Sequence, residues 1–240
     1  MIPKIIHQTI SDPAKLDAEI LDNIAFLKSN NPGWEHRLYS DQDLRKYLKG
    51  NLSSAGYEAI QKLNPKYNVV LADLFRYLVL FAEGGVYLDI KSTARKPLDS
   101  VISKDDTFIL SQWPNRLGEQ TQGAGLYPEL VRIHGGEFQQ WHIVSIPRHP
   151  FLKNVIQNAM FNCANYHPGW FGVGKIGVLR LSGPICYTLA IAPLRFRYKH
   201  RIATAEKMGF EYSIYPKRGN NEYHSQHPNH YSRQTGPIFL

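Results

Sequence analysis

Cysteine is scarce in this chain of 240 residues, which contains only Cys163 and Cys186. Two cysteines outside a C-x-x-C pair exclude a disulfide framework, and buried free thiols are their expected state. No apolar run approaches the ~20 residues of a membrane-spanning helix. The N-terminal stretch is interrupted by Lys4 and His7, which is unlike a secretory signal. These absences favour a reducing compartment, so we expect a cytoplasmic protein.

Acidic residues are scarce in the second part of the chain. Residues 146–240 carry 12 Lys and Arg against 3 Asp and Glu, whereas residues 1–145 carry 16 against 17. The formal net charge of +8 therefore comes from +9 in the second part and −1 in the first. A basic region of this kind predicts an anionic partner, which leaves nucleic acid, a phosphorylated small molecule and an anionic membrane surface open.

The apolar residues alternate between strand and helix spacing along the first part of the chain. They predict a strand at 2–6, a helix at 20–27, a strand at 34–39 and helices at 40–48, 54–63 and 67–81. This β-α-β-α-α order favours an α/β sheet with parallel strands. No repeat, low-complexity run or linker divides the sequence, so a single domain over residues 1–240 is expected.

The segment 67–81 is apolar on all faces of a helix, which indicates a buried helix. Asp73 and Arg76 lie one turn apart within it. Removing such charges from water costs several kcal/mol per ion unless they are paired or bind something. Two interpretations remain open at this point: an ion pair that braces the fold, or two side chains that face a polar ligand.

A second polar pair follows this helix. Gly84 and Gly85 end the helix, and residues 86–90 form a strand with Asp89 at its carboxyl end, where ligands of open α/β sheets bind. Period-two alternation places Lys91 on the same side of the chain as Asp89. Such an acid and ammonium can hydrogen-bond a ribose and neutralise a phosphate, or form a surface salt bridge of little consequence.

Three stretches in this order resemble one known family. They are IPKIIHQT at 2–9, ADLFRY at 72–77 and GGVYLD at 84–89. They resemble the glycosyltransferases named for a DXD-containing sugar-binding region, which include fungal initiating α-1,6-mannosyltransferases and bacterial capsular polysaccharide synthesis enzymes. Later stretches are also similar to the family: Gln140-Trp141, residues 149–152, Ser182-Gly183-Pro184 and His230-Tyr231.

The resemblance implies a GT-A type nucleotide-diphospho-sugar transferase fold, formed by a single Rossmann-like domain with a mixed sheet. Residues 1–100 would bind the nucleotide sugar, and the basic residues 101–240 would lie on the acceptor side. The reaction would move a sugar from a nucleotide diphosphate donor with retention at the anomeric carbon. The donor-binding residues that the resemblance implies are Gln8, Thr9, Asp73, Arg76, Tyr77, Gly85, Asp89 and Lys91.

The sequence departs from the family pattern at the third position of D-x-D, where the run is Asp89-Ile90-Lys91. The second acid commonly ligates Mn²⁺ or Mg²⁺, and lysine offers these cations no oxygen. Three alternatives remain open. A metal is held by Asp89 and a distant group such as His230, Lys91 itself offsets the diphosphate charge, or the protein is weakly active or inactive.

The chemistry of transfer points to further residues. Breaking a glycosyl–phosphate bond develops positive charge on the sugar and negative charge on the diphosphate. Gln140 is a candidate neighbour of the anomeric centre, and Glu137 is the nearest acid, so both join Asp89 as catalytic candidates. Trp141 is a candidate for stacking on a sugar face, although an indole is more often a core residue. Ser182 is a further candidate for a sugar or acceptor contact.

Three other patterns compete with this interpretation. The run 172–177 matches G-x-G-x-x-G, but no strand precedes it and no acid follows at the required spacing, so we expect a loop on the acceptor side. His224, His227 and His230 recur every third residue, but a zinc site lacks a fourth ligand. The run 195–201 alternates cations with aromatics, which favours a solvated strand face near anionic lipid or polymer over RNA binding.

The sequence therefore predicts a retaining glycosyltransferase that moves a hexose from a UDP- or GDP-sugar to a hydroxyl of a glycan or lipid-linked saccharide. Capsule or cell-surface polysaccharide synthesis is the expected setting. A peripheral contact with an anionic membrane is a further expectation, and nucleic acid is not an expected partner. The alternative is a non-catalytic nucleotide-sugar or polyanion binding protein of the same fold, which the missing second acid of D-x-D allows.

Overall fold

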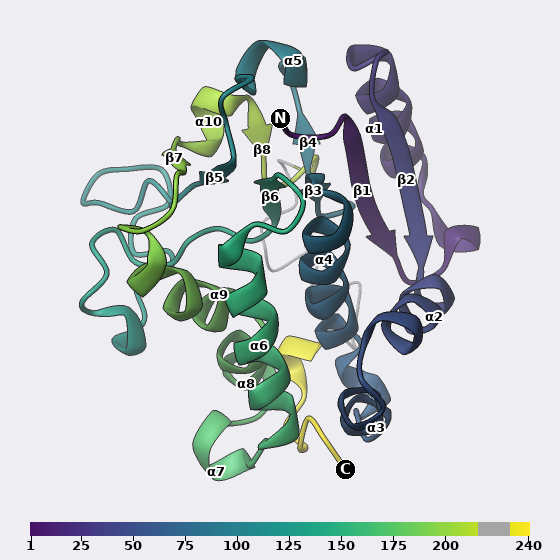
Figure 1. Ribbon diagram of the computed structural model, residues 1–240, viewed down its shortest axis with the longest axis vertical. Coiled ribbons are helices and arrows are strands. Elements are labelled where there is room, and N and C mark those ends of the chain that lie inside the picture. Colours follow the sequence, from purple (N-terminus) through teal and green to yellow (C-terminus); the bar gives the residue numbers. More distant parts are fainter. Residues whose placement is uncertain (216–230) are drawn as a thin grey trace.

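The computed structural model describes residues 1–215 and 231–240 as a mixed α/β structure (Figure 1). The strands are β1 (Ile5–Ile10), β2 (Glu35–Ser40), β3 (Gly85–Leu88), β4 (Thr93–Ala94), β5 (Phe108–Leu110), β6 (His142–Ser145), β7 (Arg201–Ile202) and β8 (Phe210–Glu211). The α-helices are α1 (Ala18–Asn30), α2 (Asp41–Asn51), α3 (Ser54–Gln61), α4 (Val69–Glu83), α5 (Leu98–Val101), α6 (Pro150–Ala164), α7 (Pro168–Phe171), α8 (Gly174–Leu181), α9 (Pro184–Ile191) and α10 (Ala205–Met208).

The main sheet has the strand order β2-β1-β3-β6-β5-β7. Strand β1 pairs in parallel with β2 and β3, and β5 pairs in parallel with β7, whereas β6 is antiparallel to both of its neighbours. Strands β4 and β8 form a separate antiparallel pair. Because β6 is the reversed strand, its first residue lies beside the carboxyl end of β3, and this register builds the site described below.

Alternation along the strands divides the core between the two faces of the sheet. Tyr87 and Ile143 face a large cluster that includes residues of α2, α4, α6, α8 and α9. Val86 and Val144 face a second cluster, to which α1, α5 and α10 contribute. Figure 1 shows α4 in front of the sheet and α6 beside it. Helix α4 is thus covered on all sides, as its sequence predicts, and ten of its fifteen residues are buried.

The predicted opening elements are confirmed, with one shift. Ser40 caps α2, and with Asp43 it forms a capping box, in which each side chain accepts from the other's backbone N–H. The sequence predicts the first strand at 2–6, but the strand runs from Ile5 to Ile10, because its polar residues pair with β2 along its whole length. His7 and Gln8 are fully buried within it. The division into residues 1–100 and 101–240 stays a prediction.

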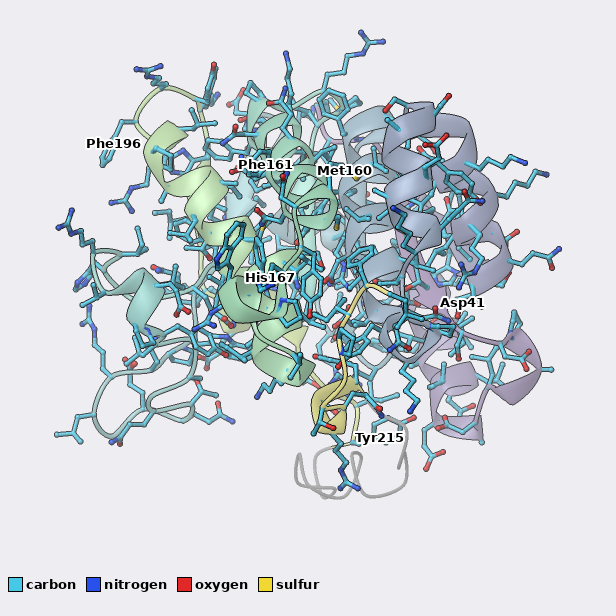
Figure 2. All side chains as sticks on the ribbon, turned by 90° about the horizontal axis from the view of Figure 1, so that it is seen from below. Asp41, Met160, Phe161, His167, Phe196 and Tyr215 are labelled. Atoms are coloured by element: carbon cyan, nitrogen blue, oxygen red, sulfur yellow. The ribbon has the colours of Figure 1, made fainter. Side chains whose placement is uncertain are left out.

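The predicted strand at 195–201 is wrong. Residues 192–194 form a 3-10 helix after α9, a turn follows, and only Arg201 and Ile202 enter the sheet as β7. Phe196 is 84% exposed, so it does not point into a core (Figure 2). Contact of this loop with an anionic surface stays a prediction.

The glycine-rich run 172–177 is also not the expected loop. Helix α7 precedes it instead of a strand, and α8 begins at Gly174. Gly174 has a positive φ of 58°, and a Cβ there would lie 2.4 Å from the carbonyl oxygen of Gln234. A Cβ on Gly177 would lie 2.8 Å from Cδ1 of Ile238. The absence of a Cβ at these glycines therefore leaves room for the C-terminal segment 231–240. This packing role agrees with the rejection of a dinucleotide site.

One apolar stretch, Gly174–Leu194, is long and apolar enough by composition to span a membrane, contrary to the sequence-based expectation. It comprises α8, α9 and the 3-10 turn after them, and 67% of its apolar window is buried inside the structure. Ile185, Tyr187 and Ile191 each have at most 1% of their surface exposed. The stretch is therefore a core element of this fold. Cys163 and Cys186 are free and buried, as predicted.

Three buried histidines predict that acid destabilises the fold. Burial lowers the pKa of His7 and His149 to about 4 and that of His142 to about 3. In the unfolded chain these rings bind protons near pH 6.5, whereas in the folded chain they stay neutral. Each ring therefore lowers the free energy of unfolding by ~2 kcal/mol as the pH falls from 7 to 5. Burial raises the pKa of Asp73 to about 6, which opposes this loss by ~1 kcal/mol over the same range.

Burial also lowers the pKa of the partly buried His36 to about 4, so we expect the free energy of unfolding in urea to fall by ~4–6 kcal/mol from pH 7 to pH 5. The substitution His142→Gln should flatten the slope, because it removes a buried ring whose pKa is lowered to about 3 and whose Nδ1 atom has no partner among the described residues. A free energy that is constant or rises toward pH 5 would show that these rings are not held neutral.

Candidate active site

Helix α4 places Asp73 and Arg76 side by side in the interior. Only 1% of Asp73 and 5% of Arg76 is exposed, and their Oδ1 and Nη2 atoms are 3.3 Å apart. Asp73 Oδ2 accepts a hydrogen bond from Ser182 Oγ at 2.8 Å, and its Oδ1 accepts from Gln140 Nε2 at 3.3 Å. Three chain segments far apart in the sequence therefore converge on one buried carboxylate.

The charge states of this pair follow from its surroundings. Burial raises the pKa of Asp73 to about 6, although Arg76 and the hydrogen bond from Ser182 oppose the shift. Burial alone would lower the pKa of Arg76, but Tyr87, Asp89 and Asp73 around it raise that pKa overall. Arg76 is therefore always positively charged, and this charge keeps Asp73 deprotonated at neutral pH.

Asp89 stands at the rim of this pair, directly after β3. Its N–H donates to the carbonyl of Trp141 at 2.8 Å, and its own carbonyl accepts from Gln8 Nε2 at 3.2 Å. Its Oδ1 atom lies 3.3 Å from Nη1 of Arg76, which also donates to the carbonyl of Gln140 at 3.0 Å. The side chain of Asp89 is 26% exposed. Arg76 thus bridges a buried carboxylate and one that can reach a ligand.

The carboxyl end of β1 borders the same cluster. Thr9 Oγ1 lies 3.0 Å from the hydroxyl of Tyr87, and Arg76 Cζ is 4.5 Å from the centroid of the Tyr87 ring. Gln8 Oε1 lies 2.8 Å from Nε2 of His36. Sequence reasoning missed Tyr87, although alternation from Asp89 places it on the same face of the strand.

Tyr77 and Ser182 complete the wall behind Asp73. The hydroxyl of Tyr77 lies 2.7 Å from the carbonyl oxygen of Ser182 and also contacts Oε1 of Gln140. The ring of Tyr77 stacks on that of Tyr187. The hydrogen bonds of these side chains hold Gln140 and Ser182 on the carboxylate of Asp73.

Two predicted site residues, Gly85 and Glu137, lie outside the cluster of Asp73, Arg76 and Asp89. A third, Trp141, contacts it through its backbone. Gly85 begins β3, at the end opposite Asp89, where a Cβ would lie 2.5 Å from the carbonyl oxygen of Ile5. Glu137 is bound to Trp113, whose Nε1 donates to its Oε1 at 2.6 Å, and burial raises the pKa of Glu137. Trp141 is 5% exposed and reaches Asp89 through its carbonyl, not its indole ring.

Lys91 lies in the turn after Asp89, beyond the end of β3, and belongs to a second polar arrangement. Its Nζ atom donates to the hydroxyl of Tyr212 at 3.0 Å and lies 4.1 Å from the ring centroid. The ring of Tyr212 packs against Trp113 and Trp141, with centroids 5.3 and 5.5 Å away. Sequence reasoning missed Tyr212, because nothing local to it shows that the preceding strand β8 pairs with β4, just after Lys91 in the chain.

The C-terminal segment packs through Tyr231 against the large apolar cluster that includes the residues of α4. Burial is the largest cause that raises the pKa of Tyr231, and Asp73 and Asp89 add to the shift through their charges. His230, the distant metal ligand suggested by the sequence, lies outside the described residues. Within residues 1–215 and 231–240, no three His, Cys, Asp or Glu side chains gather in a way that could hold a metal ion.

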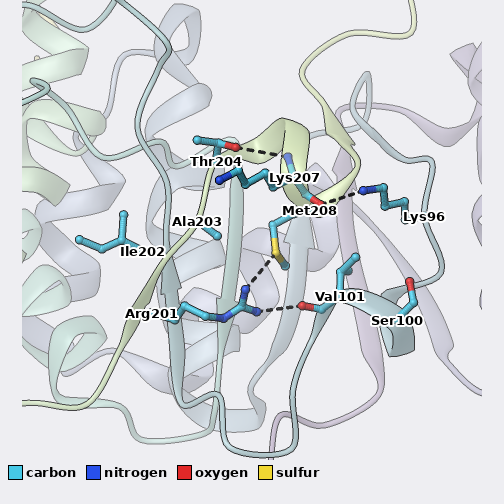
Figure 3. Close-up of a pocket in the computed structure, with 9 residues that line it drawn as sticks. All are labelled: Lys96, Ser100, Val101, Arg201, Ile202, Ala203, Thr204, Lys207 and Met208. Atoms are coloured by element: carbon cyan, nitrogen blue, oxygen red, sulfur yellow. Dashed lines mark hydrogen bonds between the residues drawn. The ribbon is translucent and has the colours of Figure 1, made fainter.

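A separate cavity of about 670 Å³ lies between α5, β7 and α10 and does not include this cluster (Figure 3). Lys96, Arg201 and Lys207 line it. Arg201 is already bound to both carboxylate oxygens of Asp106, at 2.8 and 2.6 Å. The convergence of Asp73, Arg76 and Asp89 at the carboxyl ends of β1 and β3 is therefore the better candidate site, as expected for an α/β sheet.

Part of the chain matches a known family profile, and several known sequences are similar to it. The profile described as "Glycosyltransferase sugar-binding region containing DXD motif" matches residues 17–108. The "Initiation-specific alpha-1,6-mannosyltransferase" of Schizosaccharomyces pombe is 29% identical over 79% of this chain and 48% of its own length. The enzyme of the same name from Saccharomyces cerevisiae is 37% identical over 54% of this chain and 32% of its own length. "Inositol phosphoceramide mannosyltransferase 1" of S. pombe is 28% identical over 65% and 42%.

Solved structures agree on the fold. The PaToxG glycosyltransferase superposes with a TM-score of 0.52, 17% identity and coverage of 80% of this chain and 69% of its own. The ligand-free glycosyltransferase domain of the YGT toxin gives 0.53, 10% identity and coverage of 91% and 83%. The predicted GT-A type fold is thereby confirmed.

The chain spans about half the length of the first curated relative described above, 48% of that protein. By its motifs and its sequence relatives, the chain is similar to the glycosyltransferases with a DXD-containing sugar-binding region, and it shares the fold of solved glycosyltransferase domains.

Proposed function

We propose that this chain transfers mannose from GDP-mannose to a hydroxyl of a glycan or glycolipid, with retention at the anomeric carbon. One observation carries the site: Arg76 joins the buried Asp73 to the partly exposed Asp89 at the carboxyl edge of the sheet. The names of the sequence relatives support mannose as the sugar. Those relatives support a glycan or glycolipid acceptor, and none of the three is a capsule enzyme.

The site residues have distinct roles in this proposal. Asp89 accepts hydrogen bonds from the ribose of the donor, since its carboxylate is the exposed member of the cluster. Gln140 and Ser182 hold Asp73 in place, and Arg76 orients both carboxylates. Because Arg76 is buried, its orientation costs nothing at the moment of reaction, which is how a prearranged site stabilises developing charge.

A melting-temperature screen across nucleotide sugars tests the donor. A ligand at a hundredfold excess over its Kd adds ~2.7 kcal/mol of stability, which raises Tm by ~5–10 °C for a domain of this size. We expect GDP-mannose to give the largest shift among GDP-mannose, GDP-fucose, UDP-glucose and UDP-galactose. Free mannose at the same concentration is the control for effects that do not require the nucleotide.

A transfer assay separates catalysis from binding. We expect NMR of the product to show an α-linked mannose, which retains the configuration of the donor. A chain that binds GDP-mannose but transfers nothing to mannosyl acceptors, and hydrolyses nothing, would support the binding-only alternative. A larger shift with a UDP-sugar would reject GDP-mannose as the donor.

A further inference from the structure

Lys91 occupies the position of the second acid of the DXD motif, and the structure holds it firmly. Its carbonyl accepts from the N–H of Ile214 at 2.8 Å, and its ammonium lies on the ring and hydroxyl of Tyr212. Tyr212 is itself fixed, because its carbonyl accepts from Ser92 Oγ at 2.9 Å. The side chain of Lys91 is therefore held by Tyr212, in the turn that follows Asp89.

The oxygen donors at this position do not suit a divalent cation. Mn²⁺ and Mg²⁺ require several oxygen ligands, and Asp89 is the acid that the motif retains. One oxygen of its carboxylate already lies 3.3 Å from Arg76. In the described ranges, no further acid or histidine joins it in a set of three. An ammonium two residues away along the chain also repels a second cation.

The charge of Lys91 can compensate for the charge of the metal ion that a D-x-D site would bind. Replacing an aspartate by a lysine changes the charge at this position by +2, which equals the charge of one Mn²⁺ or Mg²⁺ ion. Asp73 and Asp89 contribute two negative charges, and Arg76 and Lys91 contribute two positive ones. Among the described residues, these four groups sum to zero charge, so a diphosphate would meet an ammonium here instead of a second acid that needs a metal.

We propose that Lys91 takes the place of the divalent cation, so that the donor diphosphate binds and departs without a metal. This inference rests on the proposed function. In the transfer step, the bond from the anomeric carbon to the phosphate oxygen breaks, and its electron pair leaves on that oxygen. The acceptor oxygen bonds to the same face of the anomeric carbon, and its proton passes to the departing phosphate. Lys91 donates hydrogen bonds to the diphosphate throughout and keeps its own protons.

Calorimetry with GDP tests the inference without relying on activity. For the wild type, we expect the Kd for GDP to agree within twofold in 5 mM EDTA and in 1 mM MnCl₂. The substitution Lys91→Met should weaken binding ~10–100-fold in both conditions, as expected for a lost charged hydrogen bond. The variant Lys91→Asp, which restores D-x-D, should bind GDP weakly in EDTA and recover at least tenfold with Mn²⁺.

Matched variants control for charge and folding. Lys104→Asp makes the same change of charge on an exposed loop and should leave both Kd values unchanged. Tyr212→Phe keeps the ring beneath Lys91 and removes the hydroxyl, and it should weaken GDP binding severalfold even if Lys91→Asp does not fold. Binding by the wild type that is lost in EDTA and restored by Mn²⁺ would overturn this inference alone. Absence of binding to GDP, UDP and GDP-mannose in every condition would overturn the proposed function as well.

Discussion

Asp89→Asn is expected to lower the rate of mannosyl transfer about a hundredfold, with the melting temperature unchanged within ~2 °C. The carboxylate is the exposed end of the cluster, and a hydrogen bond to a charged group is worth up to ~3 kcal/mol, a factor of about a hundred in rate. The backbone of Asp89 is held by the carbonyl of Trp141 and by Gln8. The amide therefore keeps the position of the side chain while its charge is lost.

The comparison needs a neutralised acid outside the site. Asp22→Asn removes an exposed carboxylate on α1 and should transfer at the wild-type rate. The initial rate at saturating and at limiting GDP-mannose separates weaker donor binding from slower chemistry. Transfer by Asp89→Asn at the wild-type rate would remove this residue from the active site.

Arg76→Met is expected to lower the free energy of unfolding by ~3–5 kcal/mol at pH 7. The substitution leaves Asp73 buried without its cation, and also removes the donor to the carbonyl of Gln140. The uncompensated carboxylate can escape only by binding a proton, which becomes easier as the pH falls. The stability difference from wild type should therefore be smaller at pH 5 than at pH 7, and urea denaturation at both values measures it.

A double substitution tests the cause. Asp73→Asn in the Arg76→Met background removes the unpaired charge, so it should restore part of the lost stability. Gln140 and Ser182 can still hydrogen-bond the amide of Asn at this position. If the double variant is less stable than Arg76→Met alone, then packing of the guanidinium, and not its charge, is what α4 requires.

Local sequence signals predicted much of the first part of the fold. The caps and apolar spacing of α1 to α4 depend on neighbours a few residues away, so the sequence shows them directly. The reversed strand β6 and the short strand β7 depend on pairing across the sheet, which no local spacing encodes. The run 195–201 alternates like a strand, but the chain turns there after α9.

The candidate site was partly predictable for the same reason. Helical spacing alone brings Asp73 and Arg76 together, and the strand after Gly85 brings Asp89 to the edge of the sheet. The contact of Asp73 with Ser182 has no local signal, because 109 residues separate them. Tyr212 under Lys91 is similarly remote, at a separation of 121 residues.

These separations in the sequence have a consequence for folding during synthesis on the ribosome. Synthesis proceeds at ~5–20 residues per second, so Ser182 is made ~5–20 s after Asp73. During that time α4 has been made, but its acid lacks the hydroxyl of Ser182 and its apolar faces lack the cover of α6, α8 and α9. The nascent chain must therefore keep this helix from aggregating until nearly its whole length has emerged. We expect the yield of folded protein in cells to depend on chaperones. This dependence should be stronger than the free energy of unfolding of the finished protein would indicate.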